Sequence, residues 1–284
     1  MKPHSKEETS VSCRTFHVRA ANNRLRVQSI VPHNSEPVKN QPTLVFLHEG
    51  LGCIELWRDF PETLCASTGC AGLVYERKGY GDSEKFSGPW PLDFLQEESS
   101  TCLPSLLKAC RVDDAILIGH SDGGTIALIT ASTNSDLVRG VITEAAHIFV
   151  EDITIAGIRN AVKAFETTNL KDKLARYHKE NTETIFLRWA DRWLSPEFYN
   201  WNIEEYLPNI TCPILVIQGE DDEYGTPAQV EGIAGLVSGP VDVKLIPDCG
   251  HTPHFQAKDT VLAEMTRFIK MLIRWPGIAE TIYE

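Results

Sequence analysis

Two stretches near the start of the chain alternate apolar and polar residues, whereas six later runs are mostly apolar. The alternation over residues 14–20 and 25–31 predicts an antiparallel hairpin with one face toward solvent. The six runs are short, rich in Val and Ile and bounded by Gly or Pro, which favours strands buried on both faces. They cover residues 43–48, 71–75, 115–118, 138–143, 213–217 and 241–246.

Helix-like segments separate these strand candidates. They lie near residues 57–67, 92–110, 123–133, 227–237 and 257–274. Regular alternation of strand and helix predicts the α/β class, with a mostly parallel sheet and helices on both of its faces.

Residues 150–207 interrupt this alternation. They contain no buried-strand run and show instead several amphipathic helices rich in Trp and Arg. We therefore expect a helical cap (lid) at 150–207, inserted into a core formed by residues 1–149 and 208–284.

Length and charge narrow the class of protein. The 284 residues suit one large α/β domain that carries an insertion. The 27 basic and 39 acidic residues give a formal charge of −12, which repels nucleic acid and anionic lipid. No apolar run approaches the roughly 18 residues of a membrane span, and residues 1–10 lack the apolar region of a secretory signal. We expect no nucleic-acid or membrane partner, a disordered tail at 1–10 and a cytoplasmic location.

The eight cysteines do not form a recognisable framework. The chain contains no C-x-x-C pair, and a protein of this size needs no disulfide staples, so we expect mostly free, half-buried thiols. We expect no cofactor. The partners we expect are a small-molecule substrate and, in a homodimer, a second copy of the chain.

The candidate nucleophile is Ser121. It lies in Gly119-His120-Ser121-Asp122-Gly123, a G-x-S-x-G sequence between a buried strand and an apolar helix. This context is typical of a nucleophile elbow, a sharp turn that raises the serine oxygen above the sheet. The same turn aims the backbone N–H of Asp122 at a developing oxyanion. The alternative is a serine that only caps the helix.

The candidate base and acid follow two later strands. His251 comes after the run at 241–246, and the segment Glu220-Asp221-Asp222-Glu223 comes after the run at 213–217. The order Ser, Asp, His is the order in which the catalytic triad occurs on this type of fold. We assign His251 as the base and Asp222 as the acid that orients it. Asp221 is the second candidate, and Glu220 and Glu223 can be a solvated acidic face.

Together these motifs resemble the α/β-hydrolase superfamily over nearly the whole chain. Further matches are the His-Gly-like oxyanion loop Leu47-His48-Glu49-Gly50-Leu51-Gly52 and the D-R-x-G-x-G-x-S-like segment Tyr75-Glu76-Arg77-Lys78-Gly79-Tyr80-Gly81-Asp82-Ser83. The resemblance implies a mostly parallel eight-stranded sheet flanked by helices, with an inserted helical cap.

The chain departs from the family pattern at two positions. Glu49 stands where the family has glycine, so we expect the second oxyanion N–H from Gly50, with Glu49 as the other candidate. A buried Glu49 carboxylate needs a partner or a raised pKa, and Arg77 is the partner we expect. Glu76 replaces aspartate, a change that we interpret as structural.

Other residues have competing interpretations. His254 with Asp222 and His48 resembles a metal-ligand set, but His251 already has a role, and we expect no metal. Glu144 and His147 lie where the lid begins, and His147 either contacts substrate or only starts the lid. Trp57, Trp189 and Trp193 form either an apolar substrate wall or core.

The reaction we expect is hydrolysis of a carboxylic ester or related acyl bond, through an acyl-enzyme at Ser121. Family resemblance also allows a lactonase or a carbon–carbon bond hydrolase, whose substrate carboxylate would pair with lid arginines. The candidate arginines are Arg159, Arg188 and Arg192, and the alternative that we favour is that they are ordinary solvated residues of the lid helices. The alternative outside the enzymes is a small-molecule receptor, because receptors of this superfamily can keep the fold and all three triad residues without catalysing a reaction.

Overall fold

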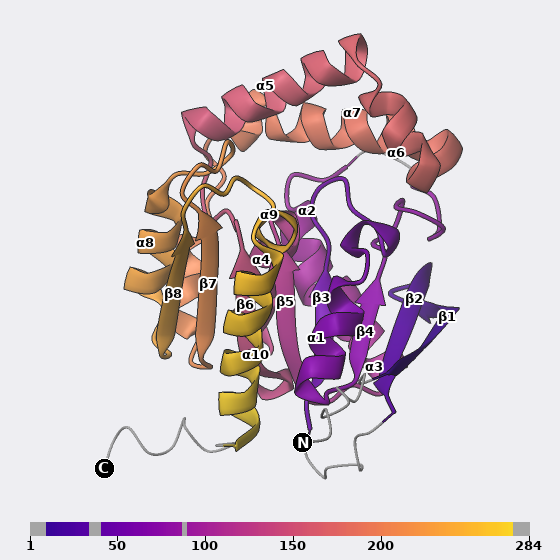
Figure 1. The fold of residues 1–284 in the computed structure, drawn as a ribbon. Helices are drawn as coiled ribbons and strands as arrows, with labels where there is room; N and C mark the ends of the chain where they lie inside the picture. The colour runs from indigo at the N-terminus through magenta and orange to yellow at the C-terminus, as the bar shows by residue number, and fades with distance from the viewer. Residues whose placement is uncertain (1–9, 34–40, 87–89, 275–284) are drawn as a thin grey trace, which may run out of the picture.

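The computed structural model describes residues 10–33, 41–86 and 90–274, and its centre is a single eight-stranded sheet (Figure 1). The strands are β1 (Val11–Ala20), β2 (Asn23–Pro32), β3 (Thr43–Leu47), β4 (Gly72–Tyr75), β5 (Ala115–His120), β6 (Val138–Glu144), β7 (Ile214–Gly219) and β8 (Val241–Ile246). Their order is β1-β2-β4-β3-β5-β6-β7-β8. The expected α/β class is confirmed. The expected tail at residues 1–10 lies outside the described residues except for Ser10.

The predicted N-terminal hairpin is present. β1 pairs with β2 in antiparallel register from Val11 opposite Pro32 to Ala20 opposite Asn23. Ala21 and Asn22 between them both have positive φ, as the two-residue turns that match strand twist require. β2 is also antiparallel to β4, and all pairs from β4 through β8 are parallel.

The α-helices of the described ranges lie on both faces of the sheet and above one of its ends. They are α1 (Phe60–Thr68), α2 (Phe94–Glu97), α3 (Leu103–Ala109), α4 (Asp122–Thr133), α5 (Asp152–Thr167), α6 (Leu170–His178), α7 (Thr182–Trp193), α8 (Pro227–Leu236), α9 (Pro253–Gln256) and α10 (Lys258–Arg274). Alternate residues of one strand enter different cores: Phe46 packs with α1 and α10, whereas Val45 packs with α3 and α4. This two-sided burial explains why the central strands are mostly apolar.

One predicted strand differs from the expectation. β8 was expected to be buried on both faces, but Val243 and Leu245 are exposed by 46% and 37%. β8 lies at the edge of the sheet and pairs only with β7. Its side chains are therefore flanked on each face by those of one neighbouring strand instead of two, which leaves Val243 and Leu245 accessible to solvent.

Helices α5, α6 and α7 form a lid above the carboxyl ends of the strands (Figure 1). The later part of the expected 150–207 insertion returns to the core, where the turn Glu204–Asn209 packs against α4 and α8. The lid is joined to the loop after β7: Thr154 Oγ1 donates to Tyr224 O at 2.6 Å. A Cβ at Gly157 would lie 2.7 Å from Glu223 O, so α5 approaches this loop where it has no side chain.

Two further expectations concern the whole chain. None of the helices in the described ranges has the length and apolar character needed to cross a membrane. All eight cysteines are free, as expected, and four of them are fully buried rather than half-buried.

Candidate active site

Ser121 occupies a strained turn between β5 and α4. Its φ of 53° and ψ of −119° lie in a region that L-residues rarely adopt. The turn depends on its glycines: a Cβ at Gly119 would lie 2.1 Å from Gly123 O, and one at Gly123 would lie 2.0 Å from Leu47 O. The geometry is that of the predicted nucleophile elbow.

Two backbone N–H groups are placed to receive negative charge near Ser121. Asp122 is the first residue of α4, so its N–H has no acceptor within the helix and lies at the positive end of the helix dipole. The second candidate is Gly50. The preceding carbonyl, Glu49 O, accepts from Arg77 Nη2 at 2.7 Å and from His48 Nδ1 at 2.7 Å. Because a trans peptide points its C=O and N–H in opposite directions, the Gly50 N–H points away from these donors.

His48 is held in one tautomer by its two partners. Its Nε2 accepts from the Arg77 backbone N–H at 3.1 Å, so the proton lies on Nδ1, which donates to Glu49 O. Burial, with the charge of Arg77, lowers the pKa of His48 to about 3, so the ring stays neutral. A neutral histidine and a buried arginine thus fix the orientation of the candidate oxyanion loop.

The structure brings Asp222 to His251 and leaves Asp221 exposed. His251 Nδ1 donates to Asp222 Oδ1 at 2.8 Å, and the same oxygen accepts from Tyr224 N at 2.8 Å. Burial alone would raise the pKa of Asp222, but the bond and charge of His251 outweigh it and hold the pKa below its usual value. Glu223 also contacts this loop, since its Oε2 accepts from His251 N at 3.1 Å.

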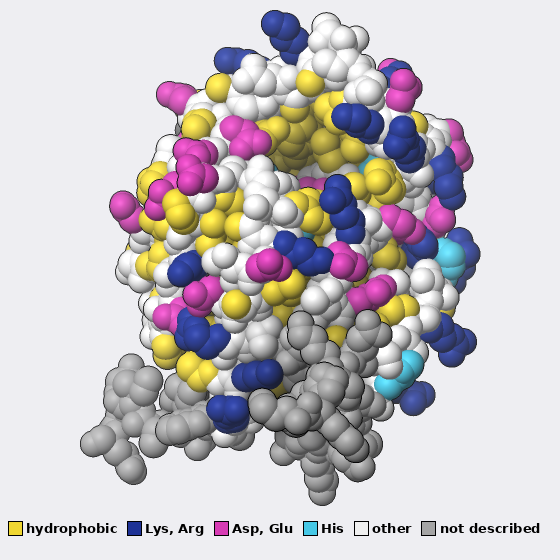
Figure 2. Space-filling model, in the orientation of Figure 1, with side chains coloured by type: hydrophobic (Ala, Val, Ile, Leu, Met, Phe, Trp, Pro, Cys, Tyr) yellow, Lys and Arg dark blue, Asp and Glu magenta, His cyan; other side chains and the backbone are white. Residues whose placement is uncertain are grey.

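A cavity of about 280 Å³ contains Ser121 and His251 and lies beneath the lid. Its polar lining consists of Glu49, His120, Ser121, Asp122, His147, Thr154, Glu223, His251 and Thr252. Its apolar lining includes Leu51, Ile158, Ala161, Leu170, Trp189 and Trp193. Figure 2 shows a hollow with hydrophobic side chains below the lid helices.

The structure brings two of the three predicted substrate residues to this cavity. His147 and Trp189 line it, and Trp193 lies with them. Trp57 does not: it is buried on the opposite side of the sheet, where its ring lies 5.6 Å from that of Phe46 and 6.4 Å from that of Phe60. The expectation of Trp57 as a substrate wall is wrong because the turn Glu55–Trp57 directs its indole into the core with α1.

The carboxylate of Glu49 has a different partner from the one expected. Arg77 binds the carbonyl of Glu49, whereas Glu49 Oε2 lies 3.8 Å from His120 Nδ1. Arg77 Nη1 is instead 3.5 Å from Asp122 Oδ2. His120 was not predicted as a site residue, because any amino acid can occupy this variable position of a G-x-S-x-G motif.

A second buried pair lies close by. His254 Nδ1 is 2.6 Å from Glu144 Oε2, and both side chains are almost fully buried. Glu144 O also accepts from Ser121 N at 2.8 Å, which ties the elbow to the end of β6. His254 therefore belongs to an ion pair and not to the metal-ligand set considered above.

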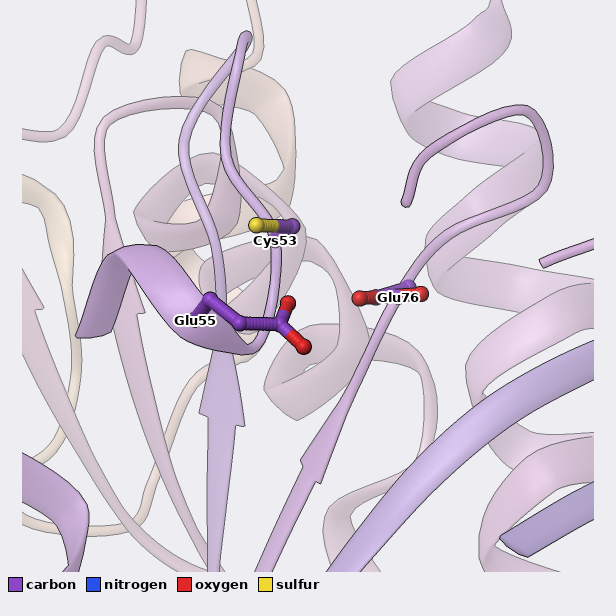
Figure 3. A group of neighbouring side chains, drawn as sticks. All are labelled: Cys53, Glu55 and Glu76. Atoms are coloured by element: carbon purple, nitrogen blue, oxygen red, sulfur yellow. The ribbon is translucent and has the colours of Figure 1, made fainter. Parts of the chain in front are cut away.

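Among the described residues, one group has metal-ligand atoms within 4.8 Å of one another: Cys53, Glu55 and Glu76. Figure 3 shows the Glu55 carboxylate, from the helical turn Glu55–Trp57, directed toward Glu76, which follows β4. Arg26 Nη1 lies 2.6 Å from Glu55 Oε1 and 2.8 Å from Glu76 Oε1, so a guanidinium already balances these carboxylates. Glu76 also accepts from Asp82 N at 2.7 Å, which fits a structural role in its loop.

A sequence model of the Alpha/beta hydrolase family matches residues 44–264, which include the elbow and the loops of Asp222 and His251. The chain belongs to this family. Of the described helices and strands, the β1–β2 hairpin, the first residue of β3 and the end of α10 lie outside the match.

Comparison with individual proteins supports the same assignment for this hydrolase. It is 27% identical to the human serine hydrolase BPHL over 196 residues, 66% of this chain and 65% of that protein. It is 24% identical to the mouse sn-1-specific diacylglycerol lipase ABHD11 over 255 residues, 80% of this chain and 81% of that protein. The chain is thus aligned with slightly less than two thirds of the length of the human enzyme.

The fold of the hydrolase resembles solved structures more fully. The enol-lactonase from Burkholderia xenovorans superposes with a TM-score of 0.69 at 19% identity, over 89% of this chain and 99% of that chain. At this identity the likeness concerns the fold alone.

Proposed function

We propose that the protein is a serine hydrolase that cleaves a carboxylic ester or related acyl bond of a small molecule through an acyl-enzyme at Ser121. The observation that carries the proposal is the 2.8 Å bond from His251 to the buried Asp222, beside a cavity that also holds the strained Ser121. This arrangement provides a nucleophile, a base and a group that orients the base.

The proposed mechanism has two half-reactions. His251 takes the proton of the Ser121 hydroxyl while Oγ attacks the carbonyl carbon, and the N–H groups of Asp122 and Gly50 stabilise the oxyanion. His251 then gives its proton to the leaving group as the acyl bond breaks. Water attacks the acyl-enzyme by the same route, and Asp222 stabilises the imidazolium in both halves. The name of one relative, the mouse sn-1-specific diacylglycerol lipase, supports acyl chemistry for this chain.

The charge of the cavity favours a neutral acyl group. The described residues that line it include Glu49, Asp122 and Glu223 but neither Lys nor Arg. The lid arginines lie elsewhere: Arg188 stacks over Phe86 at 4.4 Å and Arg192 donates to Trp90 O. A substrate carboxylate would therefore find neither lysine nor arginine among the described residues of this cavity, which disfavours the alternative of a carbon–carbon bond hydrolase acting on acids.

The cavity also offers polar atoms for orienting a substrate. His147 and Trp193 line it, and each has a buried ring nitrogen without a partner among the described residues. Burial, with the nearby His251, lowers the pKa of His147 to about 3, so this ring is neutral. A substrate that hydrogen-bonds to these nitrogens is favoured over one that leaves them unpaired.

A pair of esters that differ in charge tests the character of the cavity. We expect kcat/KM for p-nitrophenyl butyrate to exceed that for p-nitrophenyl hemisuccinate by about tenfold or more, because the anionic chain meets three acidic residues and neither Lys nor Arg in the cavity. The difference should shrink in high salt, which screens charge. Equal or faster turnover of the hemisuccinate would contradict a neutral acyl site.

The proposed function itself is tested on the wild-type protein. We expect a fluorophosphonate probe to label Ser121, identified by peptide mass spectrometry, and p-nitrophenyl acetate to give a burst followed by steady turnover. A protein that shows neither labelling nor turnover would contradict the proposal and favour a small-molecule receptor.

A further inference from the structure

Glu49 and His120 form a contact between the candidate oxyanion loop and the residue before the nucleophile. Glu49 Oε2 lies 3.8 Å from His120 Nδ1, an ion-pair distance. His120 is 1% exposed, and the Glu49 side chain, with 29% exposure, lines the cavity. A Cβ at Gly52 would lie 2.2 Å from Glu49 Oε2, so the turn leaves room for this carboxylate only because residue 52 has no side chain.

The hydrogen bond of His120 fixes which ring nitrogen carries the proton in its neutral form. Its Nε2 lies 2.7 Å from the backbone O of His251, and because a carbonyl only accepts, Nε2 carries a proton in either charge state. In the neutral ring, Nδ1 would therefore turn a lone pair toward the Glu49 carboxylate. In the imidazolium, Nδ1 presents a proton to it.

The other ionisable groups around His120 have partners or stay neutral. Glu144 is paired with His254 at 2.6 Å. His251 donates to Asp222, and burial holds the pKa of His147 at about 3. Burial lowers the pKa of His120, but Glu49 and then Glu144 outweigh it and raise the pKa above its usual value.

Of the ionisable groups described around the Glu49 carboxylate, His120 is the one that can neutralise its charge. Arg77 binds the carbonyl of Glu49 and the carboxylate of Asp122, and His48 is neutral. Burial also lowers the pKa of His178, whose Nε2 donates to Leu51 O. Burial would raise the pKa of Glu49, but the interaction with His120 outweighs it and lowers the pKa to about 2.

We propose that Glu49 and His120 are positioning residues that act as an ion pair: His120 holds the His251 loop by its carbonyl and neutralises the carboxylate beside the oxyanion N–H of Gly50. This inference rests on the proposed acyl transfer at Ser121. When His120 loses its proton, an uncompensated anion remains beside the site where the oxyanion forms, and it opposes that charge. Turnover therefore falls on the alkaline side through His120 and not through the triad.

A double-mutant cycle measured as kcat between pH 5 and 10 tests the pair with a neutral p-nitrophenyl ester. His120→Gln keeps an N–H for His251 O but has no charge, so we expect kcat to fall about tenfold near neutral pH. Glu49→Gln should remove the alkaline limb of the pH profile, because no carboxylate then remains to be left uncompensated. The double variant should recover most of the loss of His120→Gln, because neither charge remains.

Glu55→Gln is the matched control. It makes the same change six residues later, at a carboxylate that pairs with Arg26 outside the cavity, and its pH profile should match the wild type. Identical pH profiles of kcat for wild type and Glu49→Gln would overturn the ion pair. So would a double variant whose loss of kcat equals the product of the losses in the two single variants. A purely structural role would lower thermal stability without this compensation.

Histidine ¹⁵N NMR of the Ser121→Ala protein provides a test that needs no turnover. We expect His120, identified by comparison with the Ser121→Ala/His120→Gln variant, to carry protons on both ring nitrogens at pH 7.5 and to lose one after Glu49→Gln. A neutral His120 at pH 6.5 with Glu49 present would overturn the inference. Failure of the proposed function appears separately, as absent labelling of the wild-type serine.

Discussion

Replacing Ser121 by alanine is expected to lower kcat for p-nitrophenyl acetate by about 10⁴- to 10⁶-fold, with little change in KM. Alanine keeps the Cβ that the elbow already accommodates at a φ of 53°, so the turn is preserved while the attacking oxygen is lost. The cavity walls are also unchanged, so substrate still binds. Residual turnover would come from the oxyanion N–H groups and from general binding.

The control for this variant is Ser135→Ala. Ser135 lies on an exposed turn before β6 and is not among the residues that line the cavity. It should leave kcat and labelling unchanged. Near-full activity of Ser121→Ala, with melting temperatures like that of wild type, would show that another group attacks the substrate.

Replacing Asp222 by asparagine is expected to lower kcat by about 10⁴-fold, whereas Asp221→Asn changes it by less than about twofold. Asp222 Oδ1 receives the proton of His251 Nδ1, and an uncharged amide neither fixes that tautomer nor stabilises the imidazolium. Asp221 is exposed and makes no such bond. The two substitutions remove the same charge one residue apart, so each is the control for the other.

The acid dependence of the wild type follows from the same contact. The pKa of Asp222 is held below its usual value, so this carboxylate stays ionised throughout the range in which histidine titrates. Protonation of Asp222 therefore lowers kcat/KM only at pH values below the usual titration range of a carboxyl group. If Asp221→Asn shows the large loss instead, the acid is reassigned.

Local patterns in the sequence were sufficient for most of the fold. Apolar runs predicted β3 to β7 to within two residues at each end, because strands covered on both faces must be apolar throughout. β8 differs, since it carries Asp242 and Lys244, and its apolar residues Val243 and Leu245 are exposed. The amino-acid sequence of a strand does not show whether that strand pairs with one neighbouring strand or with two.

The candidate site was predictable where a motif determines the backbone. The glycines around Ser121 are required by contacts of 2.0 to 2.1 Å that a Cβ would make, so the motif itself carries the geometry. The partners of Glu49 and the place of Trp57 depend on where separate loops meet. Glu49 meets His120 across two parallel strands, β3 and β5, and no spacing in the sequence expresses that contact.

The junction between α5 and the loop after β7 has a consequence for how such enzymes diversify. Thr154 and Gly157 join the lid to Tyr224, two residues after the carboxylate that orients His251. The lid is therefore not a module that can be exchanged alone. A transplanted lid with a larger residue in place of Gly157 would displace the acid loop, so new specificities in this lineage require the lid and residues 222–224 to change together.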